Sequence, residues 1–336
     1  MNKVVKYILS ILLAIILLYF SFRGVDWEAF LIEIKNCRWG YILLAMSASA
    51  MAFWFRGLRW RGVLLPFDSS TQRLTTFNAV NIGYLANFVF PRIGEFVRCG
   101  VIVRNGKGIS YDKVLGTVVL ERLVDLLSMI LLFVVLLTFS WGRFGNFVTT
   151  NVINPLSESL NLQNGLITAI IIVVIIGIIA LLRYLRDKSK ILTKIWTALR
   201  GLGQGFASLW TMNDKWRFYF HTAIIWILYW IMSWAILRSL PSLDSMNVID
   251  ALFICLVGGL GWIVPVPGGF GAFHYIVALA FSTVYGLEFD KGLIVATLSH
   301  ESQAITMVLF GIISYVWEVV RKRKTNLQIP QEQDIT

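Results

Sequence analysis

Residues 114–140 read VLGTVVLERLVDLLSMILLFVVLLTFS, an almost uninterrupted apolar segment. About 20 such residues form a helix that crosses the roughly 30 Å hydrocarbon core of a bilayer. The whole chain is 57% hydrophobic and only 15% charged over its 336 residues, whereas soluble domains carry about 25% charged residues. Comparable segments recur at about 4–22, 40–56, 165–183, 217–238 and 291–319. Since they lack the alternation of barrel strands, they predict an all-α polytopic membrane protein with about six full transmembrane helices.

Two further apolar stretches, 74–104 and 248–285, are interrupted near their middles by PRIG at 91–94 and PVPGGFG at 265–271. Proline removes a backbone donor and glycine admits non-helical conformations, so each stretch should break into two half-helices. Irregular backbone at membrane depth survives only where protein or a water-filled cavity covers it. We therefore expect two re-entrant helical hairpins, although two full crossings in each stretch would satisfy the same sequence pattern.

The basic residues favour one topology. With six spans and two re-entrant hairpins, most of the 30 Lys and Arg residues fall on one side of the membrane together with both termini. The positive-inside rule makes that side the cytoplasm. The net charge of +11 is scattered between apolar segments rather than gathered in one stripe, so no nucleic-acid partner is expected.

The two broken stretches resemble each other. The first continues into GISYDK at 108–113 and a long helix, and the second continues into GLEFDK at 286–291 and another long helix. Three full spans separate them, which would invert the second copy relative to the first. The sequence therefore predicts an inverted repeat, with repeat-like motifs near 74–140 and 248–319, as in transporters that alternate access.

Six ionisable residues of the first repeat make it the main candidate site for a substrate. Each would cost about 3 kcal/mol if it faced lipid at mid-bilayer, so they should face one another, a cavity or the interface. Their i, i+3 and i, i+4 spacings suit a self-neutralising cluster, which leaves a structural network and a substrate site both open. The six residues are Arg92, Glu95, Arg98, Glu121, Arg122 and Asp125.

Other polar residues extend this candidate substrate-binding site. Asn81 and Asn87 give the first half-helix a polar component that could line a cavity or bond within the hairpin. In the second repeat His300 and Glu301 are costly within an apolar helix. The glycines of the second break could offer backbone N–H groups to an anionic headgroup, or could simply form a turn. They are Gly268, Gly269 and Gly271.

No catalytic, metal or cofactor motif accompanies these residues. The chain contains no GxxxxGK[ST], HExxH, CxxC or GxSxG pattern, and its three cysteines have no paired spacing. We therefore expect no cofactor and no metal site, and a role other than ATP-driven transport.

The segment NFVFPRIGEFVRCGVIVRNGKGISYDKVLGTVVLERLVDL, residues 87–126, together with PVPGGFGAFHY at 265–275, resembles the lysylphosphatidylglycerol synthase transmembrane-region family. The resemblance spans about residues 5–320 and implies a flippase-like membrane protein of the bacterial inner membrane. In similar proteins a fused soluble domain aminoacylates phosphatidylglycerol, and the membrane part moves the modified lipid outward. Two departures stand out: few residues follow Lys324, and His274 stands where similar sequences often have an acid.

The resemblance and the charged cluster together predict a lipid translocator rather than an enzyme, with residues 1–324 forming one transmembrane domain and 325–336 a polar tail. Its partners would be membrane lipids with an anionic or aminoacylated headgroup, or a lipid-linked sugar. A homo-oligomer or a partner enzyme would also fit. Two alternatives stay open: a membrane subunit or enzyme that acts on a lipid-linked substrate, and a scaffold in which the charged cluster is purely structural.

Overall fold

A computed structural model describes residues 25–106, 108–154 and 190–328, with isolated positions between 12 and 23 and at 157. Every regular element in these ranges is a helix, which confirms the all-α prediction. The spans expected at 165–183 and, for the most part, at 4–22 lie outside the described residues. The last helix continues to Gln328, four residues into the stretch expected as a polar tail.

The remaining four predicted spans are present as long helices. They are α3 (Trp39–Leu64), α6 (Tyr111–Val148), α11 (Lys215–Ser239) and α14 (Phe289–Gln328). By length and composition, five described segments could cross a membrane, the fifth being Pro267–Tyr285. The shorter helices outside the broken stretches are α2 (Trp27–Lys35), the π-helix η1 (Thr149–Ile153), α9 (Lys190–Phe206), α10 (Ser208–Thr211) and the 3₁₀-helix η3 (Pro241–Leu243).

Both broken stretches do divide into two helices. The first gives α4 (Arg73–Val89) and α5 (Gly94–Asn105), and the second gives α12 (Val248–Gly261) and α13 (Ala272–Tyr285), with the 3₁₀-helix η4 (Pro267–Gly269) between them. The residues before Pro91 and Pro267 are extended, as the proline ring favours: Phe90 has φ −133° and Val266 has φ −113°. The chain therefore leaves helical geometry at the positions that the sequence indicated.

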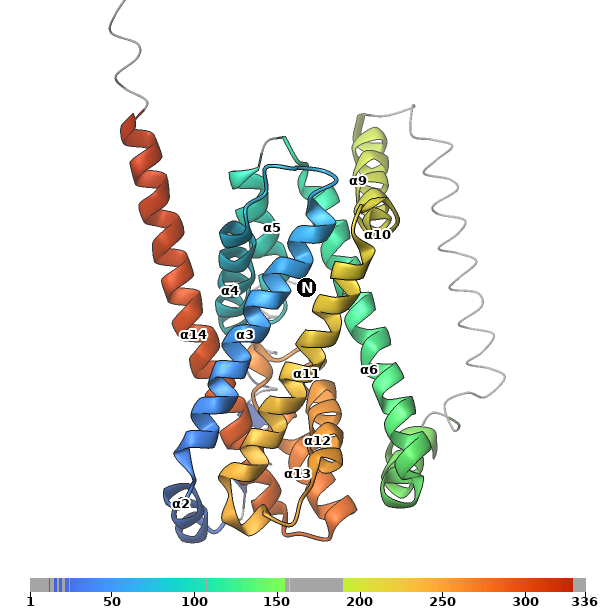
Figure 1. Ribbon diagram of the computed structural model, residues 1–336, viewed down its shortest axis with the longest axis vertical. Coiled ribbons are helices and arrows are strands. Elements are labelled where there is room, and N and C mark those ends of the chain that lie inside the picture. Colours follow the sequence, from blue (N-terminus) through green and yellow to red (C-terminus); the bar gives the residue numbers. More distant parts are fainter. Residues whose placement is uncertain are drawn as a thin grey trace, which may run out of the picture.

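The two hairpins lie at opposite ends of the molecule. In Figure 1 α4 and α5 occupy the upper half and α12 and α13 the lower half, while α3, α11 and α14 run past both. The order half-helix, break, half-helix, long helix is the same in both copies. This arrangement is the one that an inverted repeat would produce. The re-entrant path and the inverted repeat themselves stay predictions.

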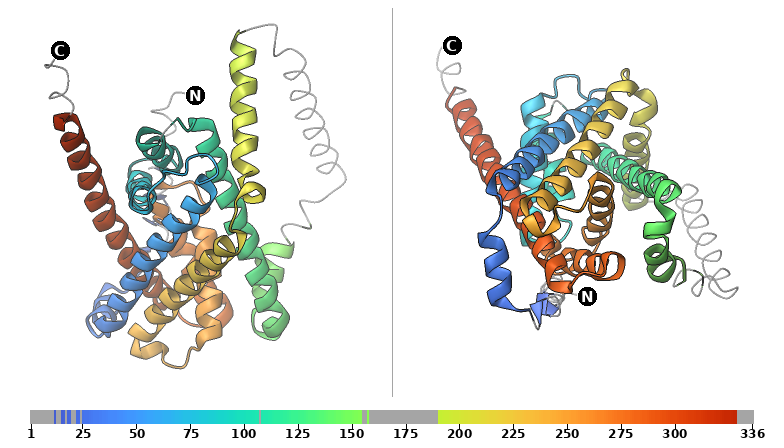
Figure 2. Two further views of the ribbon diagram at one scale, coloured as in Figure 1. Left: turned by 45° about the horizontal axis from the view of Figure 1, so that its top comes forward. Right: turned by 60° about the horizontal axis from the view of Figure 1, so that its bottom comes forward.

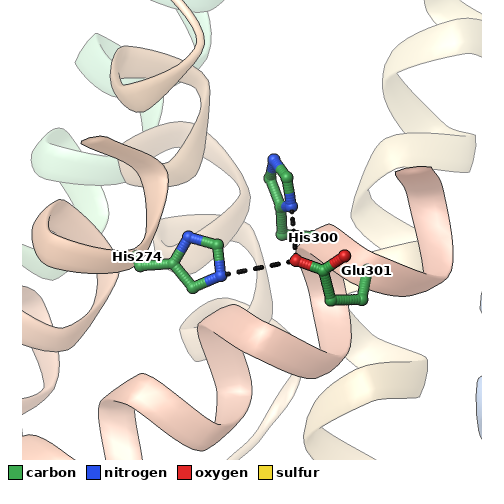
Figure 3. A group of neighbouring side chains, drawn as sticks. All are labelled: His274, His300 and Glu301. Carbon is green, nitrogen blue, oxygen red and sulfur yellow. Dashed lines mark hydrogen bonds and ion pairs between the residues drawn. The ribbon is translucent and has the colours of Figure 1, made fainter. Parts of the chain in front are cut away.

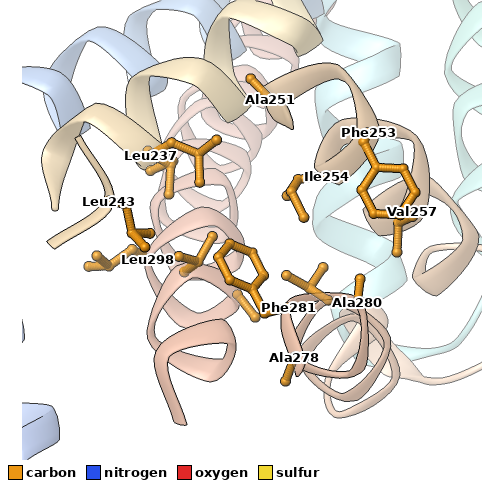
Figure 4. Close-up of a cluster of buried hydrophobic side chains, with 14 of the residues drawn as sticks. Leu237, Leu243, Ala251, Phe253, Ile254, Val257, Ala278, Ala280, Phe281 and Leu298 are labelled. Atoms are coloured by element: carbon orange, nitrogen blue, oxygen red, sulfur yellow. The ribbon is translucent and has the colours of Figure 1, made fainter. Parts of the chain in front are cut away.

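Each hairpin packs in an apolar core of its own. Around α12 and α13 the buried rings of Phe253 and Phe281 lie among side chains of α11 and α14 (Figure 4). Phe253 also stacks on Phe144 of α6, with 4.3 Å between ring centroids. A second core centres on Trp60 of α3 and on Ile102 of α5.

One face of the middle of α6 packs against the first core through Met129 and Leu136, and the other face exposes large apolar side chains. Leu127, Leu131 and Val134 are each more than half exposed. Figure 2 shows this part of α6 diverging from the bundle, with α9 beside its first half. Exposed leucine and valine suit contact with lipid tails, because an apolar side chain gains nothing by leaving hydrocarbon. This face of the apolar segment 114–140 thus suits contact with lipid.

Candidate functional site

A cavity of about 460 Å³ lies between the breaks of the two hairpins. Its volume falls in the range of small-molecule sites in proteins. One part of its wall carries charged side chains, namely Arg56, Arg92, Glu95, Arg122 and Asp125. The rest is largely apolar, with aromatic and aliphatic side chains that include Phe88, Met129, Trp262, Phe273 and Val277. The cavity is therefore amphipathic, as a lipid headgroup with its attached tails would require.

Behind the cavity a fully buried ion network joins α3, α5 and α6. The carboxylate of Glu121 accepts hydrogen bonds from Arg98 Nη1 at 2.8 Å and from Arg59 Nη2 at 3.3 Å. Arg59 also reaches Asp125, with 2.7 Å between Nη1 and Oδ1. Arg59 and Glu121 are 0% exposed and Arg98 is 3% exposed. Because charges this deep are stable only when paired, the network pins the three helices together.

The predicted ion cluster therefore divides into two parts. Arg98 and Glu121 belong to the buried network and are not among the cavity-lining residues, so the structural interpretation holds for them. Glu95, Arg122 and Asp125 face the cavity, so they are available to a ligand. Asp125 takes part in both, because it also binds Arg59.

Arg122 lines the cavity and is only loosely paired with carboxylates. Its nearest carboxylates are Glu95 at 3.6 Å and Asp125 at 3.8 Å, both longer than a charge-assisted hydrogen bond. Its buried Nε has no hydrogen-bond partner in the described part of the chain. A guanidinium in this state can still bind an anion that enters the cavity.

Arg92 links the two hairpins. It lies in the first break with φ +58°, the left-handed region that costs a non-glycine residue about 1–2 kcal/mol. Its Nη2 donates to the backbone carbonyl of Ile263, just before the second break, at 2.5 Å. This backbone conformation thus places the guanidinium of Arg92 in contact with the opposite hairpin.

The two asparagines have different places. Asn87 lines the cavity, and its Oδ1 accepts the N–H of Gly94 at 2.7 Å, which closes the first break. Asn81 is fully buried outside the cavity lining, where its Nδ2 donates to Phe77 O one turn earlier. Both asparagines therefore form hydrogen bonds within the first hairpin, and only Asn87 also faces the cavity.

The glycines of the second break form a turn rather than an open set of donors. Gly268, Gly269 and Gly271 all have positive φ, between 59° and 79°. The N–H of Gly269 bonds to Val266 O at 3.3 Å, and the next N–H bonds to Pro267 O at 3.2 Å. These contacts correct the expectation that the amide of Gly269 would be free for a headgroup. Gly268 and Gly269 line the cavity, whereas Gly271 is not part of the lining.

His300 and Glu301 lie outside the cavity lining, behind the second break. His300 is 0% exposed and contacts Gly268 O through Nε2 at 2.8 Å, while Nδ1 faces Glu301 Oε1 at 3.1 Å. They form a separate polar group with His274. Their assignment to the same site as the first-repeat charges is therefore not supported by the geometry.

Two arginines of α3, Arg56 at the cavity and Arg59 in the network behind it, are absent from the site predicted from the sequence. They follow the predicted span 40–56, but α3 continues to Leu64 and both are buried within it. Arg56 binds Asp125 Oδ2 at 3.0 Å and Tyr229 Oη at 3.0 Å. Their i, i+3 spacing, with no proline before Pro66, was the available signal that the helix extends past the apolar run.

With these two arginines the charge balance changes. The sequence indicated three cations against three anions, whereas the structure gathers five arginines and three carboxylates around the cavity and the network behind it. The residues are Arg56, Arg59, Arg92, Arg98 and Arg122, with Glu95, Glu121 and Asp125. The site thus carries a positive excess that an anionic ligand would neutralise.

The comparisons with known proteins agree with this picture at the level of the family. The family described as Lysylphosphatidylglycerol synthase TM region matches residues 7–311. No curated protein and no solved structure matches the chain. With apolar helices long enough to cross a bilayer, this match points to a multi-pass membrane protein that acts on lipids. The chain belongs to the lysylphosphatidylglycerol synthase transmembrane-region family.

Proposed function

We propose that this protein translocates a lipid across the bacterial inner membrane, with the phosphate-bearing headgroup in the cavity between the two hairpin breaks and the tails in the bilayer. The observation that carries the proposal is the amphipathic cavity of about 460 Å³, whose charged wall is formed by α3, α5, α6 and the first break.

Arg122 and Arg92 would make the main contacts with the headgroup. A phosphate accepts hydrogen bonds from a guanidinium in bidentate geometry, and Arg122 lines the cavity with a side chain that is 41% exposed. The acids Glu95 and Asp125 hold its side chain near the wall without neutralising it at short range. An anion that enters the cavity would therefore find a positioned cation.

Translocation requires that the contact between the two hairpins can open. Arg92 donates to Ile263 O across the cavity, and an incoming phosphate oxygen is a stronger acceptor than that carbonyl. Headgroup binding would then exchange a bond between the hairpins for a bond to the ligand. This coupling fits alternating access, in which broken helices of two repeats move against each other around a central site.

The proposal takes the chain to be a transporter rather than an enzyme, with both termini in the cytoplasm. Its partners would be phospholipids with an anionic or aminoacylated headgroup, or a lipid-linked sugar, all of which present a phosphate next to apolar tails. The family match supports action on lipids, and the positive excess around the cavity supports a phosphate as the group that is recognised.

A leaflet assay with matched arginine variants tests this. Purified protein is reconstituted in liposomes that carry headgroup-labelled phosphatidylglycerol, aminoacylated phosphatidylglycerol or phosphatidylcholine, and exposure of the label to an impermeant quencher is followed. Losing a hydrogen bond to a charged group costs about 1.5–3 kcal/mol, so Arg122→Gln should slow translocation roughly ten- to hundredfold. Arg104→Gln is the control, because this arginine is 47% exposed and lies outside the cavity lining.

Two results would overturn the proposal. The first is a wild-type rate equal to that of empty liposomes for every lipid in the panel. The second is an Arg122→Gln rate equal to that of wild type at matched reconstitution. Acceleration of one lipid class, lost in Arg122→Gln and kept in Arg104→Gln, would support the proposal and identify the headgroup.

A further inference from the structure

Behind the second break, two histidines and a glutamate converge on one point. His274 is in the first turns of α13, and His300 and Glu301 are adjacent in α14. Glu301 Oε1 lies 3.1 Å from His300 Nδ1 and 3.7 Å from His274 Nε2, and the three ligand atoms all lie within 4.8 Å of one another. Figure 3 shows both rings directed at the same carboxylate oxygen.

The hydrogen bonds of His300 indicate which of its ring nitrogens carries a hydrogen and which one faces Glu301. Its Nε2 lies 2.8 Å from the carbonyl oxygen of Gly268. A carbonyl only accepts, so Nε2 carries the hydrogen. In the neutral ring Nδ1 then presents a lone pair to the carboxylate of Glu301, and two acceptors 3.1 Å apart repel unless a proton or a metal ion lies between them.

A metal ion suits this position. Imidazole nitrogen and carboxylate oxygen bind Zn²⁺ at about 2.0–2.2 Å, which places tetrahedral ligand atoms roughly 3.3 Å apart. The 3.1 and 3.7 Å separations lie on either side of that value. A histidine that binds a metal through one nitrogen typically donates the other N–H to a backbone carbonyl, as His300 does to Gly268.

The surroundings fit the same role. His274 and His300 are both almost fully buried, whereas the side chain of Glu301 is 42% exposed. The indole of Trp262 stacks on His300, with 5.3 Å between ring centroids and 17° between the planes.

We propose that His274, His300 and Glu301 form a site for a divalent transition metal of the Zn²⁺ class, with a fourth position open on the exposed side of Glu301. Two imidazoles and one carboxylate are a donor set that zinc uses when it keeps one position for water. Hard cations such as Mg²⁺ prefer oxygen ligands and fit poorly.

The proposed metal would hold the second break against α14. His300 is bonded to Gly268, and Gly268 is part of the cavity wall. A metal that fixes the His300 ring also fixes this contact, so the site would set the position of the second hairpin tip. This inference does not depend on lipid translocation, because its test measures the metal itself.

The test uses the full-length protein purified through an affinity tag without histidines. After chelator treatment it is dialysed against micromolar ZnCl₂ or MgCl₂, and bound metal is measured by inductively coupled plasma mass spectrometry. We expect about one zinc per chain and no magnesium above background. His274→Ala and Glu301→Gln should each lose the bound zinc.

The chain supplies a matched control. His221→Ala removes the third histidine, which lies in α11 and contacts aromatic rings rather than this cluster, and it should keep its zinc. Glu301→Gln is nearly isosteric and changes a partly exposed side chain, so it tests the site even if His274→Ala fails to fold. The proposal is overturned if wild type binds no zinc above the magnesium-dialysed sample, or if the folded Glu301→Gln protein binds as much zinc as wild type.

Discussion

Replacing Glu121 with glutamine removes the one carboxylate of the described residues that pairs with Arg98, and it leaves two buried guanidinium groups facing a neutral amide. In the native network Glu121 lies 2.8 Å from Arg98 Nη1 and 3.3 Å from Arg59 Nη2, and all three side chains are essentially unexposed. Arg59 retains Asp125 at 2.7 Å, so Arg98 suffers the larger loss.

The magnitude follows from the geometry. With about 4 Å between charge centres and an effective dielectric constant near 20, each pair contributes about 4 kcal/mol, so two lost pairs amount to about 8 kcal/mol. The remaining amide oxygen and local relaxation recover part of this. We therefore expect Glu121→Gln to lower the free energy of unfolding by about 3–5 kcal/mol, the usual cost of removing one partner of a buried pair.

Unfolding in mixed detergent micelles, followed by tryptophan fluorescence, measures this change. Glu28→Gln makes the same substitution at an exposed position of α2 and should cost less than about 1 kcal/mol. The double variant Glu121→Gln/Arg98→Gln removes the stranded cation and should recover part of the loss. If Glu121→Gln unfolds within about 1 kcal/mol of wild type, or if the double variant is no better than the single one, the network does not stabilise the fold as described.

The hairpin packing and the loop between α11 and α12 give two further predictions. A Cβ on Gly94 would overlap the carbonyl oxygen of Gly83, so Gly94→Ala should lower the unfolding free energy by about 1–3 kcal/mol. Gly100 of the same helix is the control: a Cβ there meets open space, so Gly100→Ala should be neutral or slightly stabilising in the same assay. Arg38 binds Asp244 at 2.8 and 2.6 Å and lowers the pKa of that carboxyl. A lowered carboxyl pKa adds stability that is fully present above the unfolded-state pKa and is lost as the pH falls through the folded-state pKa. Thermal unfolding should therefore show Asp244→Asn below wild type at about pH 7, by a margin that shrinks as the pH falls below about 3.9; an unchanged difference would contradict the pairing.

The sequence interpretation succeeded where the cause is local. A long apolar run needs internal backbone hydrogen bonding in a bilayer, so helices were the expected solution, and α3, α6, α11 and α14 are present. Proline and glycine act on the backbone dihedral angles of their own neighbourhood, so both breaks also occur where expected. The family resemblance, which depended on these same motifs, is confirmed by the match over residues 7–311.

The functional site depended on more than local pattern. Which charges face the cavity is set by the rotation of each helix and by its neighbours, so Glu121 is buried in a network while Arg122, the next residue, lines the cavity. Arg59 and Glu121 meet although they are 62 residues apart, and no spacing rule relates them.

The sequence by itself therefore determined the membrane class, the helices and the positions of the two breaks, because hydrophobicity and backbone stereochemistry act over a few residues. Only the tertiary structure decided that Arg56 joins the cavity wall, and that His274 of α13 meets Glu301 of α14. The physical reason is that pairing of buried polar groups is settled by which helix faces come together, and those contacts form between segments far apart in the chain.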